Sequence, residues 1–395
     1  MTVRILLLSY YFPPDLSAFR VEALVNGLLT YGNDEIEIDV LTTQPNRYPS
    51  YTFSWDRTAH QPRLSITRID LPTHGFSVWG QAWGFANYAC GVLRAVKGKQ
   101  YDVIVATSSR LMTATLGAAI ARQKKAPLYL DIRDIFVDVL PELFPGVMGK
   151  LLARVFSRVE QFTLDRATRA NLISPGFLSY FSARYPHKRF STFTHGVDDL
   201  FLETPFYPDT PNEPTRPLKI VYAGNIGVGQ GLDKILPSLA ERLANTACFY
   251  VIGDGSTMKK LREALIEGHV KNVELIAPMP RHKLIHYYQQ ADVLFLHLND
   301  FKAFLKVIPS KLFEYAATGK PILAGLEGYS KAFTLNHIPN ACVFAPGNPD
   351  AAVAALARLR LSATDREAFL RAYSRSTIQQ RMAFDILETA TLTEQ

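Results

Sequence analysis

Short apolar runs alternate with longer helical patterns along the whole chain. The first run, Val3 to Ser9, leads into a loop and then into a helical pattern from Ser17 to Leu29 that stops at Gly32. Helices between such strands carry the chain back to the same edge of a sheet, so neighbouring strands run parallel. The alternation therefore predicts an α/β protein with mostly parallel, doubly wound sheets. We expect the other strands at residues 36–42, 64–69, 101–107, 128–132, 171–174, 218–223, 248–252, 273–276, 293–298 and 322–324.

A proline-dense segment, residues 205–217, interrupts this alternation, and a chain of 395 residues is too long for one ordinary core. We therefore expect a Rossmann-like N-terminal domain at 1–204, a linker at 205–217 and a second Rossmann-like domain at 218–372, with the two domains facing a cleft. Residues 373–395 are expected to form a helix that crosses back to the N-terminal domain, because its apolar stripe needs a surface to cover. The stripe consists of Ile378, Met382, Ile386 and Ala390.

The composition limits where the protein works and what it binds. Three cysteines, Cys90, Cys248 and Cys342, lie far apart in apolar runs, so we expect buried thiols in a reducing compartment. The sequence shows neither a secretion signal nor an apolar stretch of transmembrane length, so we expect a cytoplasmic location. The net charge of +7 favours anionic partners and does not separate nucleotide, nucleic acid and acidic lipid.

One short helix in the C-terminal half has clear signals at both ends. Pro309 and Ser310 are typical of a helix start, and Gly319 and Pro321 are typical of its end. These signals predict a helix from about Ser310 to Thr318, followed at once by an apolar strand.

Lys311 and Glu314 lie in the first turns of this helix. A helix N-terminus carries partial positive charge, so a lysine there is unfavourable unless an anion such as phosphate binds beside it. The Glu314 carboxylate leans back toward the same end and is able to accept two hydroxyl donors. The pair fits a nucleoside diphosphate, and it also fits an ordinary surface helix with a Glu–Lys pair.

The first strand after the proline-dense segment opens into a glycine-rich turn at residues 224–231. Such a turn lets a phosphate approach the backbone closely, although its spacing departs from the dinucleotide-binding pattern. Loops after the next two strands converge on the same edge of the sheet. The candidate binding residues at this edge are Gly224, Asn225, Gly227, Gln230, Gly253, Asp254, Pro278, Met279, Ser310, Lys311, Leu312 and Glu314.

Loops after the N-terminal strands carry aromatic and charged residues, at the edge where parallel sheets bind ligands. Structural explanations also exist: Pro13 and Pro14 fit a turn, and Arg133 with Asp134 fits a structural ion pair. Candidate site residues in these loops are Tyr10, Phe12, Pro13, Arg20, Ser109 and His195, and Arg133 and Asp134 join Lys311 as candidate catalytic residues.

Two further segments have surface character. A helical stripe within residues 77–96 fits a membrane surface, but we favour packing on the sheet, the usual arrangement in α/β proteins. A basic region within residues 150–189 fits either a solvated helix face or a dock for anionic lipid. The stripe contains Trp79, Trp83, Ala86, Cys90 and Leu93, and the basic region contains Lys150, Arg154, Arg158, Arg166, Arg169, Arg184, Lys188 and Arg189.

In combination, these motifs resemble those of the GT-B glycosyltransferases of the retaining family 4, in particular the bacterial O-antigen and capsule transferases such as the L-fucosamine transferases. The matching segments are residues 8–14, 131–134, 195–198, 222–227, 253–255, 291–293 and 308–323. The resemblance implies transfer of a sugar, with retention, from a nucleotide diphosphate sugar, expected to be a UDP-sugar, to a lipid-linked oligosaccharide. It implies that the candidate residues of the C-terminal loops bind the donor and that those from Tyr10 to His195 lie on the acceptor side. It implies no cofactor and no nucleic-acid partner, and a cytoplasmic enzyme with a peripheral contact to anionic inner-membrane lipid. Without a D-x-D metal-binding pair, we expect a metal-independent reaction.

Several positions depart from the family pattern. The glycine pair of the first N-terminal loop is absent, with Ser17 and Ala18 nearby, and Arg133 and Asp134 stand where a histidine is often found. Lys306 stands where many members carry the first of two acidic residues, the second being Glu314. Asn225 and Gln230 replace the cations that usually grip the donor pyrophosphate, which leaves Lys311 as the expected cation. Two alternatives therefore stay open: a UDP-sugar 2-epimerase of related fold, and an inactive nucleotide-sugar-binding partner.

Overall fold

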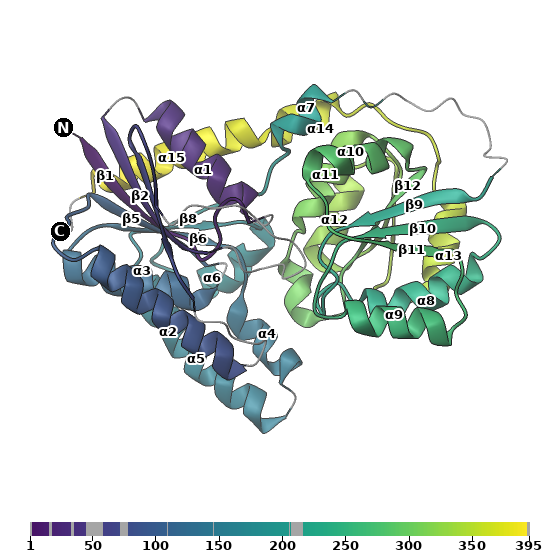
Figure 1. Cartoon of the computed structure of the whole chain (residues 1–395), viewed down its shortest axis with the longest axis horizontal. Coiled ribbons are helices and arrows are strands. Elements are labelled where there is room, and N and C mark those ends of the chain that lie inside the picture. Colours follow the sequence, from purple (N-terminus) through teal and green to yellow (C-terminus); the bar gives the residue numbers. More distant parts are fainter. Residues whose placement is uncertain are drawn as a thin grey trace. The chain divides into compact units, whose positions relative to one another are not determined.

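A computed structural model describes residues 2–15, 18–32, 35–44, 58–71, 78–108, 110–144, 146–204, 206 and 216–392. The chain divides into two compact units (Figure 1). Unit 1 comprises residues 1–194 and 376–395, and unit 2 comprises residues 195–375. Each unit has its own parallel sheet covered by helices, as the alternation of apolar runs predicts.

The described part of unit 1 contains an eight-stranded sheet in the order β3-β4-β2-β1-β5-β6-β7-β8. Neighbouring strands are parallel except β3, which pairs antiparallel with β4 at one edge. The strands are β1 (Val3–Leu8), β2 (Ile36–Thr43), β3 (Thr58–Gln61), β4 (Leu64–Ile69), β5 (Val103–Thr107), β6 (Leu128–Ile132), β7 (Arg169–Leu172) and β8 (Phe190–Ser191).

Helices cover both faces of this sheet (Figure 1). They are α1 (Phe19–Tyr31), α2 (Val78–Ala95), α3 (Leu111–Lys124), α4 (Phe136–Leu143), α5 (Val147–Arg166), α6 (Leu178–Arg184) and α15 (Arg375–Ala390). Helices α1 and α15 pack on one face against Ile5, Leu7 and Val105. Helices α2, α3 and α5 lie on the opposite face.

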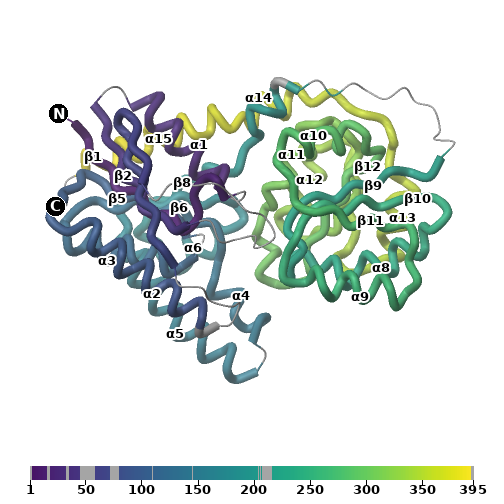
Figure 2. Tube along the Cα trace, viewed as in Figure 1, coloured from purple at the N-terminus to yellow at the C-terminus, as the bar shows by residue number. Residues whose placement is uncertain are grey.

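Helix α15 follows unit 2 in the chain and packs within unit 1. Met382, Ala383 and Ile386 lie in the same apolar core as the inward face of α1. The ring of Phe384 lies 6.2 Å from that of Tyr31, and Figure 2 shows the two helices side by side. The apolar stripe of this helix is therefore covered by unit 1.

The described part of unit 2 contains a six-stranded parallel sheet in the order β11-β10-β9-β12-β13-β14. Its strands are β9 (Leu218–Ala223), β10 (Ala247–Ile252), β11 (Val273–Ile276), β12 (Val293–His297), β13 (Ile322–Gly325) and β14 (Ala341–Phe344). Its helices are α7 (Asp199–Glu203), α8 (Leu232–Arg242), α9 (Met258–Glu267), α10 (Arg281–Gln290), α11 (Ser310–Thr318), α12 (Gly328–His337), α13 (Pro349–Arg358) and α14 (Glu367–Tyr373). None of the described helices is long and apolar enough to span a membrane.

Unit 2 begins before the proline-dense segment. Helix α7 packs in the core of unit 2, where the ring of Phe201 stacks on that of Tyr288 at 6.1 Å. The division after Thr194 thus differs from the expected domain end at residue 204, because apolar contacts hold α7 to α10 and α11 of unit 2. Most of the expected linker lies outside the described residues.

The favoured packing of the tryptophan-containing stripe on the sheet is wrong. Trp83 is 63% exposed, and Cys90 and Leu93 are also exposed. The buried face of α2 instead presents Tyr88 and Val92, and the Tyr88 hydroxyl donates to the Leu41 carbonyl at 2.9 Å. The face of α2 that carries the hydrogen-bonded Tyr88 is therefore the one that packs inward. Cys90 lies on the other face, so the expectation that its thiol is buried is wrong.

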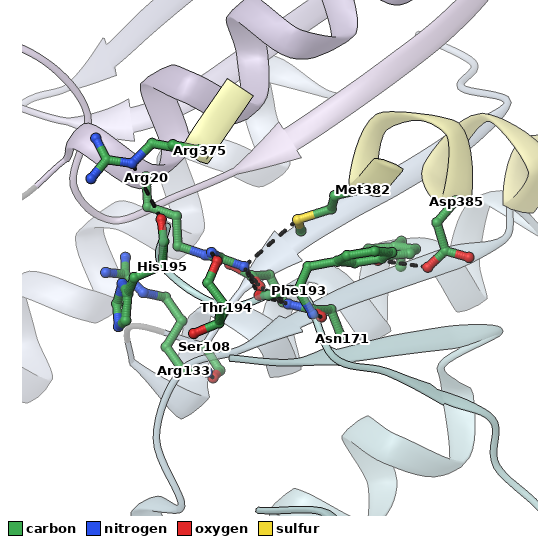
Figure 3. Close-up of polar contacts among 12 residues, drawn as sticks. Arg20, Ser108, Arg133, Asn171, Phe193, Thr194, His195, Arg375, Met382 and Asp385 are labelled. Atoms are coloured by element: carbon green, nitrogen blue, oxygen red, sulfur yellow. Dashed lines mark hydrogen bonds and ion pairs between the residues drawn. The ribbon is translucent and has the colours of Figure 1, made fainter. Parts of the chain in front are cut away.

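A buried ion pair between α1 and β6 lies in unit 1. Arg20, which is 1% exposed, donates from Nη2 to Asp131 Oδ1 at 2.8 Å. Its guanidinium also donates to the carbonyls of Phe193 and Thr194 (Figure 3). Asn171 donates to the same Asp131 oxygen at 2.7 Å. Burial raises the Asp131 pKa, but Arg20 outweighs it and the net shift is downward.

We predict that Arg20→Ala destabilises unit 1 by about 3–5 kcal/mol, because it leaves the Asp131 charge buried without its cation. Arg4→Ala is the control, since Arg4 pairs with Glu37 on the exposed surface and should cost about 1 kcal/mol or less. Denaturant unfolding of the two variants measures the difference. Equal losses of unfolding free energy in the two variants would show that the buried Arg20–Asp131 pair contributes no more to stability than the exposed Arg4–Glu37 pair.

Candidate functional site

Helix α11 has the bounds that its end signals predict, Ser310–Thr318. Pro309 precedes it without a side-chain cap, and Gly319 ends it in the left-handed conformation with φ of 70°. Most of its residues are buried, so it is not an ordinary surface helix. The helix start thus retains the partial positive charge that favours an anion.

The Glu314 carboxylate is held by two cations. Arg281 donates from Nη2 to Oε1 at 2.7 Å, and Lys311 donates from Nζ to Oε2 at 2.8 Å. Glu314 is 2% exposed. Burial raises its pKa, but Lys311 and Arg281 outweigh burial and lower the pKa to about 2. The carboxylate is therefore ionised throughout the physiological range.

The ion pairs continue beyond Glu314. Arg281 also donates to Asp198, and Arg375 donates to the same Asp198 oxygen. Asp198 caps α7 by accepting from the Leu200 N–H at 3.1 Å. Burial raises the Asp198 pKa, whereas the two arginines lower it and prevail. We call this set the ion-pair chain: Lys311, Glu314, Arg281, Asp198 and Arg375.

The glycine-rich turn between β9 and α8 lies beside this chain. A β-carbon on Gly224 would lie 3.7 Å from Lys311 Cε, so the lysine stem runs along the turn. The Asn225 amide donates to Gln230 Oε1 at 2.7 Å, and the Tyr222 hydroxyl donates to the Asn225 carbonyl at 2.6 Å. The two residues that replace the usual cations are therefore bonded to each other across the turn.

The loop after β10 packs directly on the glycine-rich turn. A β-carbon on Gly253 would collide with the Gly224 carbonyl oxygen, so only glycine fits there. The Ile226 N–H donates to the Asp254 carbonyl at 2.9 Å, and the Asp254 carboxylate accepts from the Gly255 N–H at 2.7 Å. Pro278 and Met279, after β11, are half-buried and directly precede α10, which begins at Arg281.

His297 holds the glycine-rich turn through a hydrogen bond to the backbone of Gln230. Its Nε2 accepts from the Gly347 N–H at 2.9 Å, so its Nδ1 carries the proton and donates to the Gln230 carbonyl, 2.6 Å away. The ring lies nearly parallel to those of Phe295 and Phe344, with centroids 6.3 Å and 6.1 Å away. Burial lowers its pKa to about 4, and the Gln230 bond opposes this shift only in part.

The predicted acceptor-side residues in unit 1 are mostly buried. Tyr10 is fully buried, with the Arg110 guanidinium 4.1 Å from its ring centre, and Phe12 is 6% exposed. Arg20 is buried and bonded to Asp131. Pro13 is half-buried, and Ser109 lies outside the described residues.

The remaining candidates lie near unit ends or sheet ends. The Arg133 N–H donates to Ser108 Oγ at 2.8 Å; the Arg133 side chain is half-buried and Asp134 is exposed. His195 belongs to unit 2, where its carbonyl accepts from Arg375 Nε at 3.2 Å (Figure 3). Arg281 and Arg375 were not among the predicted site residues. Arg281 could have been predicted as a cation at a helix start after a strand-end loop.

Two family models match the chain. Residues 204–375 match the model of glycosyl transferases group 1, and residues 19–190 match that of the glycosyl transferase 4-like domain. A comparison with curated protein sequences finds no match.

Solved structures share the fold over nearly the whole chain. Sucrose-phosphate synthase from Thermosynechococcus elongatus is 15% identical with a TM-score of 0.69, covering 98% of this chain and 96% of that one. WaaG, a glycosyltransferase involved in lipopolysaccharide biosynthesis, is 14% identical with a TM-score of 0.62, covering 98% and 95%. HepE from Anabaena, in complex with UDP and glucose, is 13% identical with a TM-score of 0.54, covering 98% and 96%.

We predict that His297 makes stability depend on pH between about 4 and 6.5. The unfolded imidazole, with a pKa of 6.5, takes up a proton before the folded one, so the free energy of unfolding falls as pH drops through this window and is fully retained above it. The loss should reach about 3 kcal/mol. Thermal unfolding of wild type and His297→Gln across this window measures it.

The His297→Gln variant should lack this component of the pH dependence, whereas His187→Gln, at an exposed position, should retain it. A wild-type slope in His297→Gln would assign the pH dependence to other groups.

Proposed function

We propose that this chain, which belongs to the glycosyltransferases of GT-B type, moves a sugar with retention from a UDP-sugar to a lipid-linked glycan in bacterial surface polysaccharide biosynthesis. The observation that carries the proposal is the ion-pair chain, in which three cations face two carboxylates. The ion-pair chain places Lys311 at the start of α11 and beside the glycine-rich turn. The negative charge of a diphosphate is able to bind these cations and the N–H groups of the helix start.

The donor contacts follow from this geometry. Lys311 and the backbone at Gly224 would hold the diphosphate, with Ser310 and Leu312 in the first turn of α11. Glu314 would accept the ribose hydroxyls, as a carboxylate one turn inside a phosphate-binding helix can. Pro278 and Met279, half-buried after β11, would line the nucleobase side. HepE, of the same fold, is known in complex with UDP.

The proposed chemistry uses the donor's own leaving group. The acceptor hydroxyl attacks the anomeric carbon from the face that the diphosphate leaves, the glycosidic C–O bond breaks, and a departing phosphate oxygen takes the acceptor proton. Negative charge grows on the diphosphate as this bond breaks, so a cation in a water-poor site stabilises the transition state more than the ground state. We assign this role to Lys311 without a metal, and retain Arg133 and Asp134 as candidate catalytic residues in unit 1.

A panel of nucleotide sugars tests the proposed function. A bound donor at 100 times its Kd should raise the free energy of unfolding by about 2.7 kcal/mol, which a thermal shift detects. UDP-sugars should protect the protein and other nucleotide sugars should not. Conversion of a UDP-sugar without any acceptor would instead show the epimerase, and binding without turnover would show an inactive partner.

We predict that Lys311→Met lowers kcat by about two orders of magnitude with the donor so identified, while KM rises less, because the charge acts mainly in the transition state. Lys331→Met is the matched control, since Lys331 pairs with Glu327 on α12 at 3.1 Å and lies outside the ion-pair chain. Near-normal turnover in Lys311→Met, with a loss in Lys306→Met, would transfer the role to Lys306.

A lipid-linked acceptor requires contact with a membrane, and we propose that α5 makes it. Val147, Leu151 and Val155 are 83%, 52% and 52% exposed and recur at helical spacing. Exposed basic side chains, Lys150, Arg154 and Arg158, lie among them. An exposed apolar stripe with flanking cations matches the headgroup region of an anionic bilayer.

We predict that the protein binds vesicles of phosphatidylglycerol and not of phosphatidylcholine. Replacing Lys150, Arg154 and Arg158 together by Gln should weaken binding by about 100-fold, since each cation contributes about 1 kcal/mol near such a surface. Flotation with vesicles measures this. The control replaces the exposed Lys259, Lys260 and Ile266 of α9 by Gln, Gln and Ser and should bind as wild type does.

A further inference from the structure

Both oxygens of the Glu314 carboxylate are engaged by cations in this structure. Oε1 accepts from Arg281 at 2.7 Å and Oε2 accepts from Lys311 at 2.8 Å. The proposed function gives the same two oxygens to the ribose hydroxyls and the same Lys311 to the diphosphate. A donor cannot obtain these contacts in full while the present ion pairs stay unchanged.

The members of the ion-pair chain differ in their access to solvent. The side chains of Lys311 and Arg281 are 25% and 27% exposed, whereas that of Glu314 is 3% exposed. An incoming anion therefore meets the two cations before it meets the carboxylate. Hydrogen bonds between charged groups are about twice as strong as those between neutral groups. An incoming phosphate can therefore compete with Glu314 for Lys311 and Arg281.

Arg281 has a second attachment that does not involve Glu314. Its Nη1 donates to Asp198, which Arg375 holds in turn, while Nη2 donates to Glu314. The rigid guanidinium fork keeps the first contact when the second is exchanged. Arg375 is itself fixed, because it also donates to the His195 and Gly196 carbonyls at 3.2 Å.

We propose that Glu314 occupies the phosphate-binding cations in the free protein and that donor binding exchanges these partners. Arg281 Nη2 and Lys311 Nζ turn to the diphosphate, and the released Glu314 oxygens accept the ribose hydroxyls. Arg281 is thus a further donor-binding residue, positioned by Asp198 and Arg375. This inference rests on the proposed function and adds to it an internal competitor for the phosphate.

The exchange has a consequence that a purely structural ion pair lacks. Removing the Glu314 charge should strengthen binding of a diphosphate alone, because its competitor is lost. The same change should weaken binding of a nucleoside alone, because the carboxylate that accepts the ribose is lost. We therefore test the two halves of the donor separately, with inorganic pyrophosphate and with uridine.

Titration calorimetry of Glu314→Gln should show pyrophosphate binding about tenfold tighter than in wild type, and uridine binding about tenfold weaker, as expected for one charge-assisted hydrogen bond each. Glu327→Gln, which removes the carboxylate of the Glu–Lys pair on α12, should change neither affinity. Weaker or unchanged pyrophosphate binding in Glu314→Gln would overturn the exchange.

Arg281→Gln provides a second measurement, independent of whether Glu314→Gln folds. It should bind pyrophosphate about tenfold more weakly and uridine as wild type does. Wild-type affinity for pyrophosphate in Arg281→Gln would remove Arg281 from the donor site. If wild type binds UDP and these variants behave otherwise than stated, only the proposed exchange of partners fails. If wild type binds neither UDP nor pyrophosphate, the proposed function fails as well.

Discussion

A buried carboxylate between two cations is the interaction on which the candidate site depends. Glu314 is too deeply buried to remain ionised alone, and Lys311 and Arg281 keep it charged. In return, the carboxylate holds both cations at the start of α11 and beside the glycine-rich turn. The position of Arg281 depends further on Asp198 and Arg375, so residues distant in sequence determine one charge distribution.

The glycine-rich turn is held by neutral contacts. Asn225 and Gln230 satisfy each other, and His297 bonds the Gln230 carbonyl while remaining uncharged. Arg281 and Lys311 add positive charge on the α10 and α11 side of the turn, where both bind Glu314. An arginine at the start of α10 can supply the charge that the family pattern places on the turn itself.

Much of the fold was predictable from local patterns. The alternation of apolar runs and helical segments predicted both parallel sheets, because strand and helix periods are properties of short windows. The edge strands β3, β8 and β14 were missed. β3 and β8 contain few apolar residues, and β14, although apolar, is only four residues long. The prediction buried the wrong face of α2, because the sequence alone favours Trp83 and Leu93 as core residues. In the structure the opposite face is buried, where Tyr88 bonds the Leu41 carbonyl.

The sequence by itself determined the two α/β units, the bounds of α11 and the placement of Lys311 and Glu314 one turn apart, because capping signals and i to i+3 spacing act within a few residues. Only the tertiary structure decided that Glu314 is buried and that Arg281 shares it, because these two residues meet only when α10 and α11 pack in one unit. It also decided that Arg20 is enclosed with Asp131, a contact between α1 and β6 that no local pattern specifies. Ion pairs between distant segments are set by packing, which fixes burial and partner together.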